Sequence, residues 1–226
     1  MREFGSDKRF CTLQITICAE PSQQNVKLEL IFNLGGERRS EEERSCYDSL
    51  QNVVVRFQEN AWADERVAMQ YLETFRESTL HQGEVLLGMD NHGAQSTALC
   101  REFMAHMGIV PAYTPANCTD CVSPVDKNVA ETLKKLIRKK YSSEFALHRD
   151  EWNVGLPESE KRQKVALWAS EAWTEFCRDH QDCIKSAFVK TGFLLAKDGS
   201  ENSKVCLWTE NGRATNVAPD GTPYWF

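Results

Sequence analysis

The sequence predicts an α/β domain built on one mixed sheet, with helices on both faces and a C-terminal helical extension. Three patterns support this prediction. Apolar and polar residues alternate through the first part of the chain, short apolar runs then alternate with helical patterns, and one long helical pattern follows. Strands separated by helices pair in parallel, whereas directly successive strands form hairpins. We therefore expect antiparallel pairing in the first part of the sheet and parallel pairing in the second.

The composition is that of an ordinary globular chain. Of its 226 residues, 41% are hydrophobic, 27% charged and 10% aromatic, enough to build a core in one large domain or two small ones. No run approaches the ~18 apolar residues of a membrane span, and the charged start does not resemble a secretory signal. The nine cysteines are therefore expected as free thiols. Because the net charge is −6, contact with a nucleic acid requires a local basic patch.

The first two strands are expected at 11–19 and 26–32, where apolar side chains recur at every second position. Turn-forming residues at 20–25 separate them, so the pair is predicted to form an antiparallel hairpin. A charged loop that opens with glycine is expected at 35–44. A third short strand is expected at 53–57, within the antiparallel part of the sheet.

Helices and strands alternate from residue 62 onward. The pattern at 62–76 predicts a helix with a single apolar face. This face consists of Ala68, Met69, Tyr71, Leu72 and Phe75. The apolar run at 84–89 predicts a buried parallel strand, which ends at Asp90.

A second helix is expected at 96–107, with Leu99, Phe103 and Met107 on one face. The following strand, at 109–113, contains Pro111, which favours a position near the edge of the sheet. A loop bounded by prolines then leads to a basic amphipathic helix at 126–141.

The long helical pattern at 159–190 completes the predicted fold and ends near Gly192. Its apolar face consists of Val165, Trp168, Ala172, Trp173 and Phe176, and its tryptophans are expected in the core rather than on a surface that stacks bases. This order of elements is the ribonuclease-H-like arrangement. We expect a core at 7–145, an extension of the same domain at 150–208, and a loosely ordered tail at 209–226.

Two carboxylates follow strands or loops at places where ligands bind in α/β sheets. Asp90 ends a predicted buried strand, and the carboxyl ends of parallel strands form ligand sites. Asp126 follows the proline-bounded loop. Asp126 fits an N-terminal helix cap, and Asp90 fits the start of a turn; together, the two carboxylates also fit a site for a divalent cation such as Mg²⁺. Both interpretations stay open at this point.

Several motifs resemble a known family. The segment Asp-Asn-His-Gly-Ala-Gln at 90–95 is similar to the second-carboxylate motif of DDE superfamily endonuclease domains of the pogo/Tigger-like transposases. The segment at 114–131 resembles the loop and helix start that carry the third carboxylate of that family. Residues 59–75 are similar to the segment before the first helix of the family, and residues 161–199 resemble its C-terminal helices and strand. The resemblance extends from about residue 7 to residue 208.

The resemblance implies a function as well as a fold. It implies a ribonuclease-H-like nuclease that cleaves and transfers DNA strands with Mg²⁺ or Mn²⁺, in the nucleus. Asp90 and Asp126 would be the catalytic metal ligands, and His92 and Gln95 would contact phosphate or orient a ligand. For His92, an exposed loop histidine is an equal alternative. Expected partners are DNA and either a second copy of the chain or other transposon-derived proteins.

The first carboxylate of the family has no counterpart here, because its strand would precede residue 7. We therefore expect a core that is truncated at its N-terminus and has two of three carboxylates. Glu20 and Glu29 are the nearest substitutes, but their positions predict a solvated hairpin end and a solvent-facing strand residue. Two hypotheses remain: a metal-dependent DNA endonuclease, or a catalytically inactive transposon remnant that binds DNA or proteins. A phosphate-binding α/β domain is a third, less favoured by the absence of a glycine-rich phosphate motif.

The strongest remaining signal for DNA binding is a basic stripe on the helix predicted at 126–141. This stripe contains Lys127, Lys134, Lys135, Arg138, Lys139 and Lys140, against the single acid Glu131. Such a stripe beside a metal site can hold phosphates through counterion release. A solvated helix face without a ligand explains the same pattern equally well.

Overall fold

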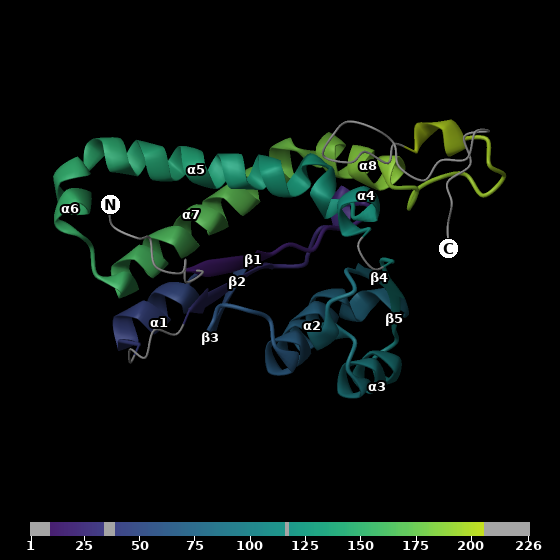
Figure 1. Ribbon diagram of the computed structural model, residues 1–226, viewed down its shortest axis with the longest axis horizontal. Coiled ribbons are helices and arrows are strands. Elements are labelled where there is room, and N and C mark those ends of the chain that lie inside the picture. The colour runs from purple at the N-terminus through teal and green to yellow at the C-terminus, as the bar shows by residue number, and fades with distance from the viewer. Residues whose placement is uncertain (1–9, 34–38, 116–117, 206–226) are drawn as a thin grey trace, which may run out of the picture.

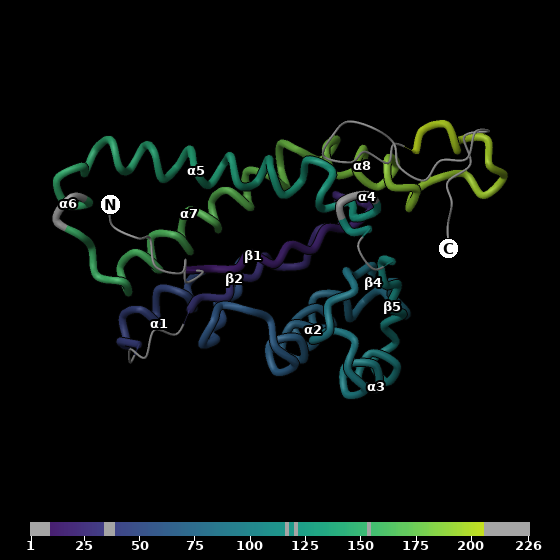
Figure 2. The backbone as a smooth tube through the Cα atoms, viewed as in Figure 1, coloured from purple at the N-terminus to yellow at the C-terminus, as the bar shows by residue number. Residues whose placement is uncertain are grey.

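The computed structural model describes residues 10–33, 39–115 and 118–205, except the side chains at 120, 121, 153 and 154. Long helices form one layer, the first three strands lie beneath them, and a smaller unit of strands and helices lies at one end (Figure 1). The tube in Figure 2 shows how the chain returns along the long helices after it leaves this smaller unit. The strands are β1 (Cys11–Gln14), β2 (Leu28–Asn33), β3 (Val53–Gln58), β4 (Val85–Met89) and β5 (Ile109–Tyr113). The helices are α1 (Glu41–Asp48), α2 (Glu65–Thr79), α3 (Ala98–His106), α4 (Thr119–Val122), α5 (Ala130–Leu147), α6 (Arg149–Val154), α7 (Glu158–Asp179) and α8 (Gln181–Lys190).

The predicted hairpin is confirmed, because β1 pairs with β2 in antiparallel register from Cys11 opposite Phe32. However, β1 is shorter than the alternation predicts. Beyond Gln14, the side chain of Gln24 lies between the two segments. Its amide donates to the carbonyl oxygens of Thr16 and Val26 at 3.0 and 3.1 Å. One side chain therefore replaces the strand pairing there.

The third strand, β3, pairs with β2 in parallel, so the antiparallel expectation for it was wrong. The reason is that α1 lies between the two strands and forms a crossover, whereas a loop was predicted at 35–44. The hydroxyl of Ser40 accepts a hydrogen bond from the backbone N–H of Glu43 at 3.1 Å. This Ser-x-x-Glu pattern is the sequence signature of a helix start, and it could have predicted α1.

The later strands β4 and β5 pair in parallel as predicted, but they form a separate two-stranded sheet. No strand in the described part of the chain joins β1 to β4, so the expected single sheet does not form. Nor is β4 buried on both faces. Leu87 and Met89 lie in the core, whereas Leu86 on the opposite face is 64% exposed.

Helix α2 begins at its cap Asp64 and buries most of the predicted face, together with Val67. Helix α3 begins after Thr97, and its fully buried residues are Cys100 and Met104, whereas Phe103 and Met107 of the predicted face are half-buried. Leu99 is 51% exposed. The two buried side chains share a cluster with Leu72 and Phe75 of α2, so the position of α2 determines which face of α3 is covered.

The two faces of the first sheet are covered by different helices. Leu30 and Val55 share one cluster with the buried side of α7, which includes Trp173. The tryptophans of α7 are therefore core residues, as predicted. Arg56, on the opposite face, donates to the backbone oxygen of Gln70 in α2 at 2.9 Å. Helices on both faces of this sheet are thus observed.

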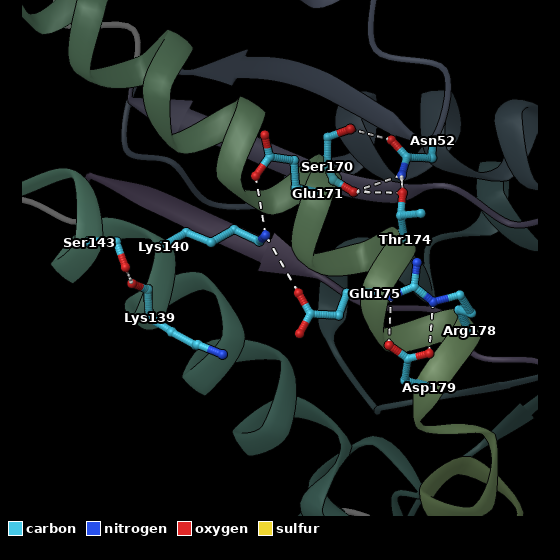
Figure 3. Close-up of polar contacts among 10 residues, drawn as sticks. All are labelled: Asn52, Lys139, Lys140, Ser143, Ser170, Glu171, Thr174, Glu175, Arg178 and Asp179. Atoms are coloured by element: carbon cyan, nitrogen blue, oxygen red, sulfur yellow. Dashed lines mark hydrogen bonds and ion pairs between the residues drawn. The ribbon is translucent and has the colours of Figure 1, made fainter.

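Ion pairs and hydrogen bonds connect α7 to the neighbouring elements (Figure 3). The Lys140 ammonium of α5 lies 3.2 and 3.5 Å from the carboxylates of Glu171 and Glu175 in α7. At the sheet side, the Asn52 amide donates to the Ser170 carbonyl at 2.8 Å. The predicted continuous helix at 159–190 is interrupted at His180, where the backbone leaves helical angles and α8 begins.

The C-terminal part of the described chain contains turns after α8, and the strand implied there by the resemblance is absent from residues 191–205. The predicted loose tail at 209–226 lies outside the described residues. The seven cysteines that the structure describes are free thiols. No helix among the described residues is long and apolar enough to span a membrane.

Candidate functional site

A cleft of about 670 Å³ lies between the two sheets. One wall is residues 12–19, which include the unpaired edge of β1, and the opposite wall is residues 85–90, which include β4. Tyr71 and Phe75 of α2 also line the cleft, as do Phe188 and Phe193 near the end of α8. Most of the cleft is therefore apolar, and its acidic lining residues are Asp90, which follows β4, and Asp126, which precedes α5.

Asp90 is exposed and directly follows β4. Its position is fixed by the neighbouring strand, because the backbone N–H of Thr114 donates to the carbonyl oxygen of Met89 at 2.8 Å. The ends of β4 and β5 are thereby held side by side. Asp90 thus occupies the carboxyl end of a parallel strand, as the sequence predicts.

Asp126 lies on a single irregular turn, Val125–Val129, and is exposed. The predicted helix start at residue 126 was wrong, because the backbone of Lys127 is not helical and Asn128 has a left-handed φ of 72°. Helix α5 begins only at Ala130. Asp126 is therefore not at the N-cap position of α5, and the kink holds it apart from the helix.

Asp90 and Asp126 line the same cleft, together with the predicted residues His92 and Gln95. Three buried side-chain atoms at this cleft have no hydrogen-bond partner: His92 Nδ1, Gln95 Oε1 and Thr114 Oγ1. Unpaired buried polar atoms are rare in folded proteins, so these three atoms are candidate contacts for a ligand or a water. Sequence reasoning missed Thr114. The only sequence signal was its position directly after β5, next to the strand that carries Asp90.

Among the residues that the structure describes, no third carboxylate lines the cleft. Within the described residues, no group of three or more His, Cys, Asp or Glu side chains is arranged to hold a metal ion. Glu29 was predicted to face solvent, which was wrong: it is 1% exposed and bonded to Arg56. Glu20 is exposed at the hairpin end, as predicted, and it hydrogen-bonds to Ser22. Neither glutamate lines the cleft.

Helix α5, on which the basic stripe was predicted, begins next to the turn Val125–Val129 and runs from the region of α4 toward α6 (Figure 1). Lys134, Lys135 and Arg138 are exposed, and Lys135 forms an ion pair with Glu131 at 2.6 Å. Lys127 is only 9% exposed and does not belong to this exposed stripe. The kink before α5 turns it inward, which helical periodicity did not predict.

An aromatic pair lies at the same cleft. Trp62 is 50% exposed, and its ring stacks on the His92 imidazole with 6.2 Å between centroids and 21° between planes. Both residues line the cleft. Sequence reasoning placed Trp62 at the start of a helix, whereas it precedes the Asp64 cap and stays outside α2.

The comparisons with known proteins agree with the motifs. The family model described as DDE superfamily endonuclease matches residues 11–187, well over half of the chain. No curated protein and no solved structure matches this chain significantly. The matched region contains all the residues that line the cleft except Phe188 of α8 and those of the following segment, and it includes the motif at Asp90 and the turn at Asp126. The chain belongs to the DDE superfamily endonuclease family.

Proposed function

We propose that this chain is a transposase-derived nuclease domain that binds DNA at the cleft and cleaves its strands with the help of a divalent cation. One observation carries the proposal: Asp90 and Asp126, from distant parts of the sequence, line one cleft with three buried polar atoms that have no partner. DDE superfamily endonucleases generally use divalent metal ions and act on DNA.

The side chains present fit a hard divalent cation. Two carboxylates, one amide oxygen and one hydroxyl are all oxygen donors, the ligand type that Mg²⁺ and Mn²⁺ prefer. In this proposal, Asp90 and Asp126 hold the cation, and Gln95 Oε1 and Thr114 Oγ1 are available to orient it or its water. When bound, such cations stabilise the attacking and leaving oxygens of a phosphodiester displacement.

The finer assignments belong to the same proposal. The motifs at 90–95 and 114–131 support membership of the pogo/Tigger-like group, with a ribonuclease-H-like arrangement and a nuclear location. Lys134, Lys135 and Arg138 would hold the DNA backbone beside the cleft, because exposed cations bind phosphates by releasing counterions. A second copy of the chain or another transposon-derived protein would be the protein partner.

A catalytically inactive DNA-binding domain is the second candidate. It is favoured by the observation that, among the described residues, the cleft is lined by two acidic side chains, Asp90 and Asp126. Two carboxylates bind a metal more weakly than three, so chemistry that needs two cations would be slow.

Nicking of supercoiled plasmid DNA in the presence of Mg²⁺ or Mn²⁺ distinguishes the two candidates. The nuclease predicts metal-dependent nicking that Asp90→Ala and Asp126→Ala each abolish. Asp150→Ala is the matched control, because Asp150 is an exposed aspartate on α6 outside the cleft. Plasmid binding without nicking supports the inactive domain. Nicking that persists in both cleft variants contradicts the proposed site.

A further inference from the structure

We propose that Trp62 and His92 form a stacking platform for one unpaired nucleobase of the DNA bound at the cleft. The inference rests on the proposed function and extends it, because it specifies the class of substrate: single-stranded DNA, or a duplex end whose bases are unpaired. The base would lie on the exposed part of the Trp62 ring, while the backbone of the same strand approaches Asp90.

The first argument is the exposure of Trp62. A tryptophan in a folded domain normally buries most of its large apolar surface, but half of Trp62 is open to solvent. Its ring nevertheless lies nearly parallel to the His92 imidazole, with 21° between the two planes. An exposed and oriented aromatic ring at a cleft is the feature by which proteins stack single-stranded bases.

The second argument is that the backbone holds Trp62 firmly. The preceding residue, Ala61, is fully buried and has a left-handed φ of 53°, an unusual conformation for alanine. Its carbonyl accepts a hydrogen bond from Thr12 Oγ1 at 2.5 Å, and its N–H donates to the Gln58 carbonyl at 3.2 Å. Such strained residues persist only where the surroundings enforce them, and they concentrate at functional sites.

The third argument is the place of the platform. His92 follows Asp90 by two residues, so the ring pair lies beside the candidate metal ligand and lines the same cleft. Bases in an intact duplex are already stacked on both sides, and an enzyme must separate them to gain contact with one. The platform therefore favours a strand with an unpaired base next to the bond that is cleaved.

Binding measured in EDTA tests this inference without any cleavage. A fluorescently labelled single-stranded oligonucleotide and a blunt duplex of the same sequence are titrated with the wild type, Trp62→Ala and Trp62→Phe. Loss of one stacked base weakens binding roughly 5- to 150-fold. We expect this loss for Trp62→Ala with the single strand only, near wild-type binding for Trp62→Phe, and unchanged affinity for the duplex.

Two further measurements keep the outcome unambiguous. Thermal melting reports whether each variant is folded. If Trp62→Ala unfolds, Trp62→Leu replaces it, because leucine is a large apolar side chain without a flat ring. With 2-aminopurine in the oligonucleotide, wild-type binding should quench its fluorescence, and the leucine variant should not. Equal single-strand affinity in wild type and Trp62→Leu overturns the inference, as does equal weakening for both DNA forms.

Failure of the platform and failure of the proposed nuclease are separable. Metal-dependent nicking with unchanged single-strand binding in the Trp62 variants would retain the nuclease and reject the platform. Loss of single-strand binding in these variants, without nicking by the wild type, would retain the platform on an inactive DNA-binding domain.

Discussion

The Arg56 guanidinium donates two hydrogen bonds to the Glu29 carboxylate, at 2.8 and 2.7 Å, across the parallel strands β2 and β3. The side chains are only 12% and 2% exposed. The same guanidinium also donates to Gln70 and Thr74 of α2. This bidentate pair joins both strands to the helix that covers them, and α2 leads directly to β4 and Asp90.

Breaking this pair from one side should destabilise the fold strongly. Arg56→Met leaves the Glu29 carboxylate buried without its partner, which typically costs about 3–5 kcal/mol. Urea denaturation followed by circular dichroism measures the loss in the free energy of unfolding. The double variant Glu29→Met/Arg56→Met is the control. It should recover most of the lost free energy of unfolding, because neither buried charge remains. Equal destabilisation by the single and double variants would show that the ion pair is not the cause.

A second buried pair should make stability depend on pH. Burial raises the pKa of Glu43, but hydrogen bonds from Arg162 at 2.8 Å and Tyr47 at 2.7 Å outweigh it and hold the pKa below its ordinary value. The stabilisation is therefore present above the unfolded pKa of about 4.3 and is lost as the pH falls through the lower folded pKa. Urea denaturation at a series of pH values should give the wild type a higher free energy of unfolding than Glu43→Gln at neutral pH. The difference should disappear at acidic pH. A constant difference would contradict this linkage.

Two thiols should resist alkylation in the folded protein. Burial raises the pKa of Cys11 to about 12, and burial likewise raises that of Cys177 to about 12. At pH 8 the reactive thiolate is therefore scarce at both positions. Mass spectrometry after iodoacetamide treatment should find these cysteines modified only after unfolding in urea. In the unfolded chain the pKa of a thiol is about 8.5. The raised pKa values of the folded state therefore stabilise the fold below that pH, and this stabilisation is lost as the pH rises through the folded pKa. Rapid labelling of the native protein would contradict the burial.

The basic stripe on α5 should control the salt dependence of DNA binding. Replacing Lys134, Arg138 and Lys139 with alanine removes three exposed charges. Each lost phosphate contact should reduce the slope of log affinity against log salt by about 0.9 for duplex DNA. Lys161→Ala, on α7 and paired with Glu158, is the control. An unchanged slope in the triple variant would identify the stripe as a solvated helix face.

Local periodicity predicted most elements of this fold but not how they pair. Alternation identified β1 and β2, and the helical face of α7 was correct through Phe176. It could not show that α1 makes β3 parallel to β2. Nor could it show that α2 covers Glu29, because a carboxylate facing solvent and one facing a buried arginine have the same place in the pattern. The face of α3 was likewise decided by packing against α2 rather than by its own sequence.

The sequence pointed to two acidic residues of the candidate site but not to the residues around them. Motifs gave Asp90 and Asp126, and the fold places both at one cleft. Thr114 was missed because a threonine after a strand carries no signal by itself. Trp62 was missed because a single aromatic residue cannot be assigned to core or surface before the turn at Ala61 is known. The inward turn of Lys127 depends on a local kink that helical periodicity does not encode.

Shared coordination of one divalent cation by Asp90 and Asp126 is tested most directly by Mn²⁺ binding, measured as loss of the free-ion signal in electron paramagnetic resonance. Wild type, Asp90→Asn, Asp126→Asn and the control Asp150→Asn are titrated with Mn²⁺ in the absence of DNA. We predict that wild type and Asp150→Asn bind equally, that each cleft variant binds more weakly, and that the double variant Asp90→Asn/Asp126→Asn does not bind. Equal binding by all these proteins would contradict the assignment of these two carboxylates to one metal site.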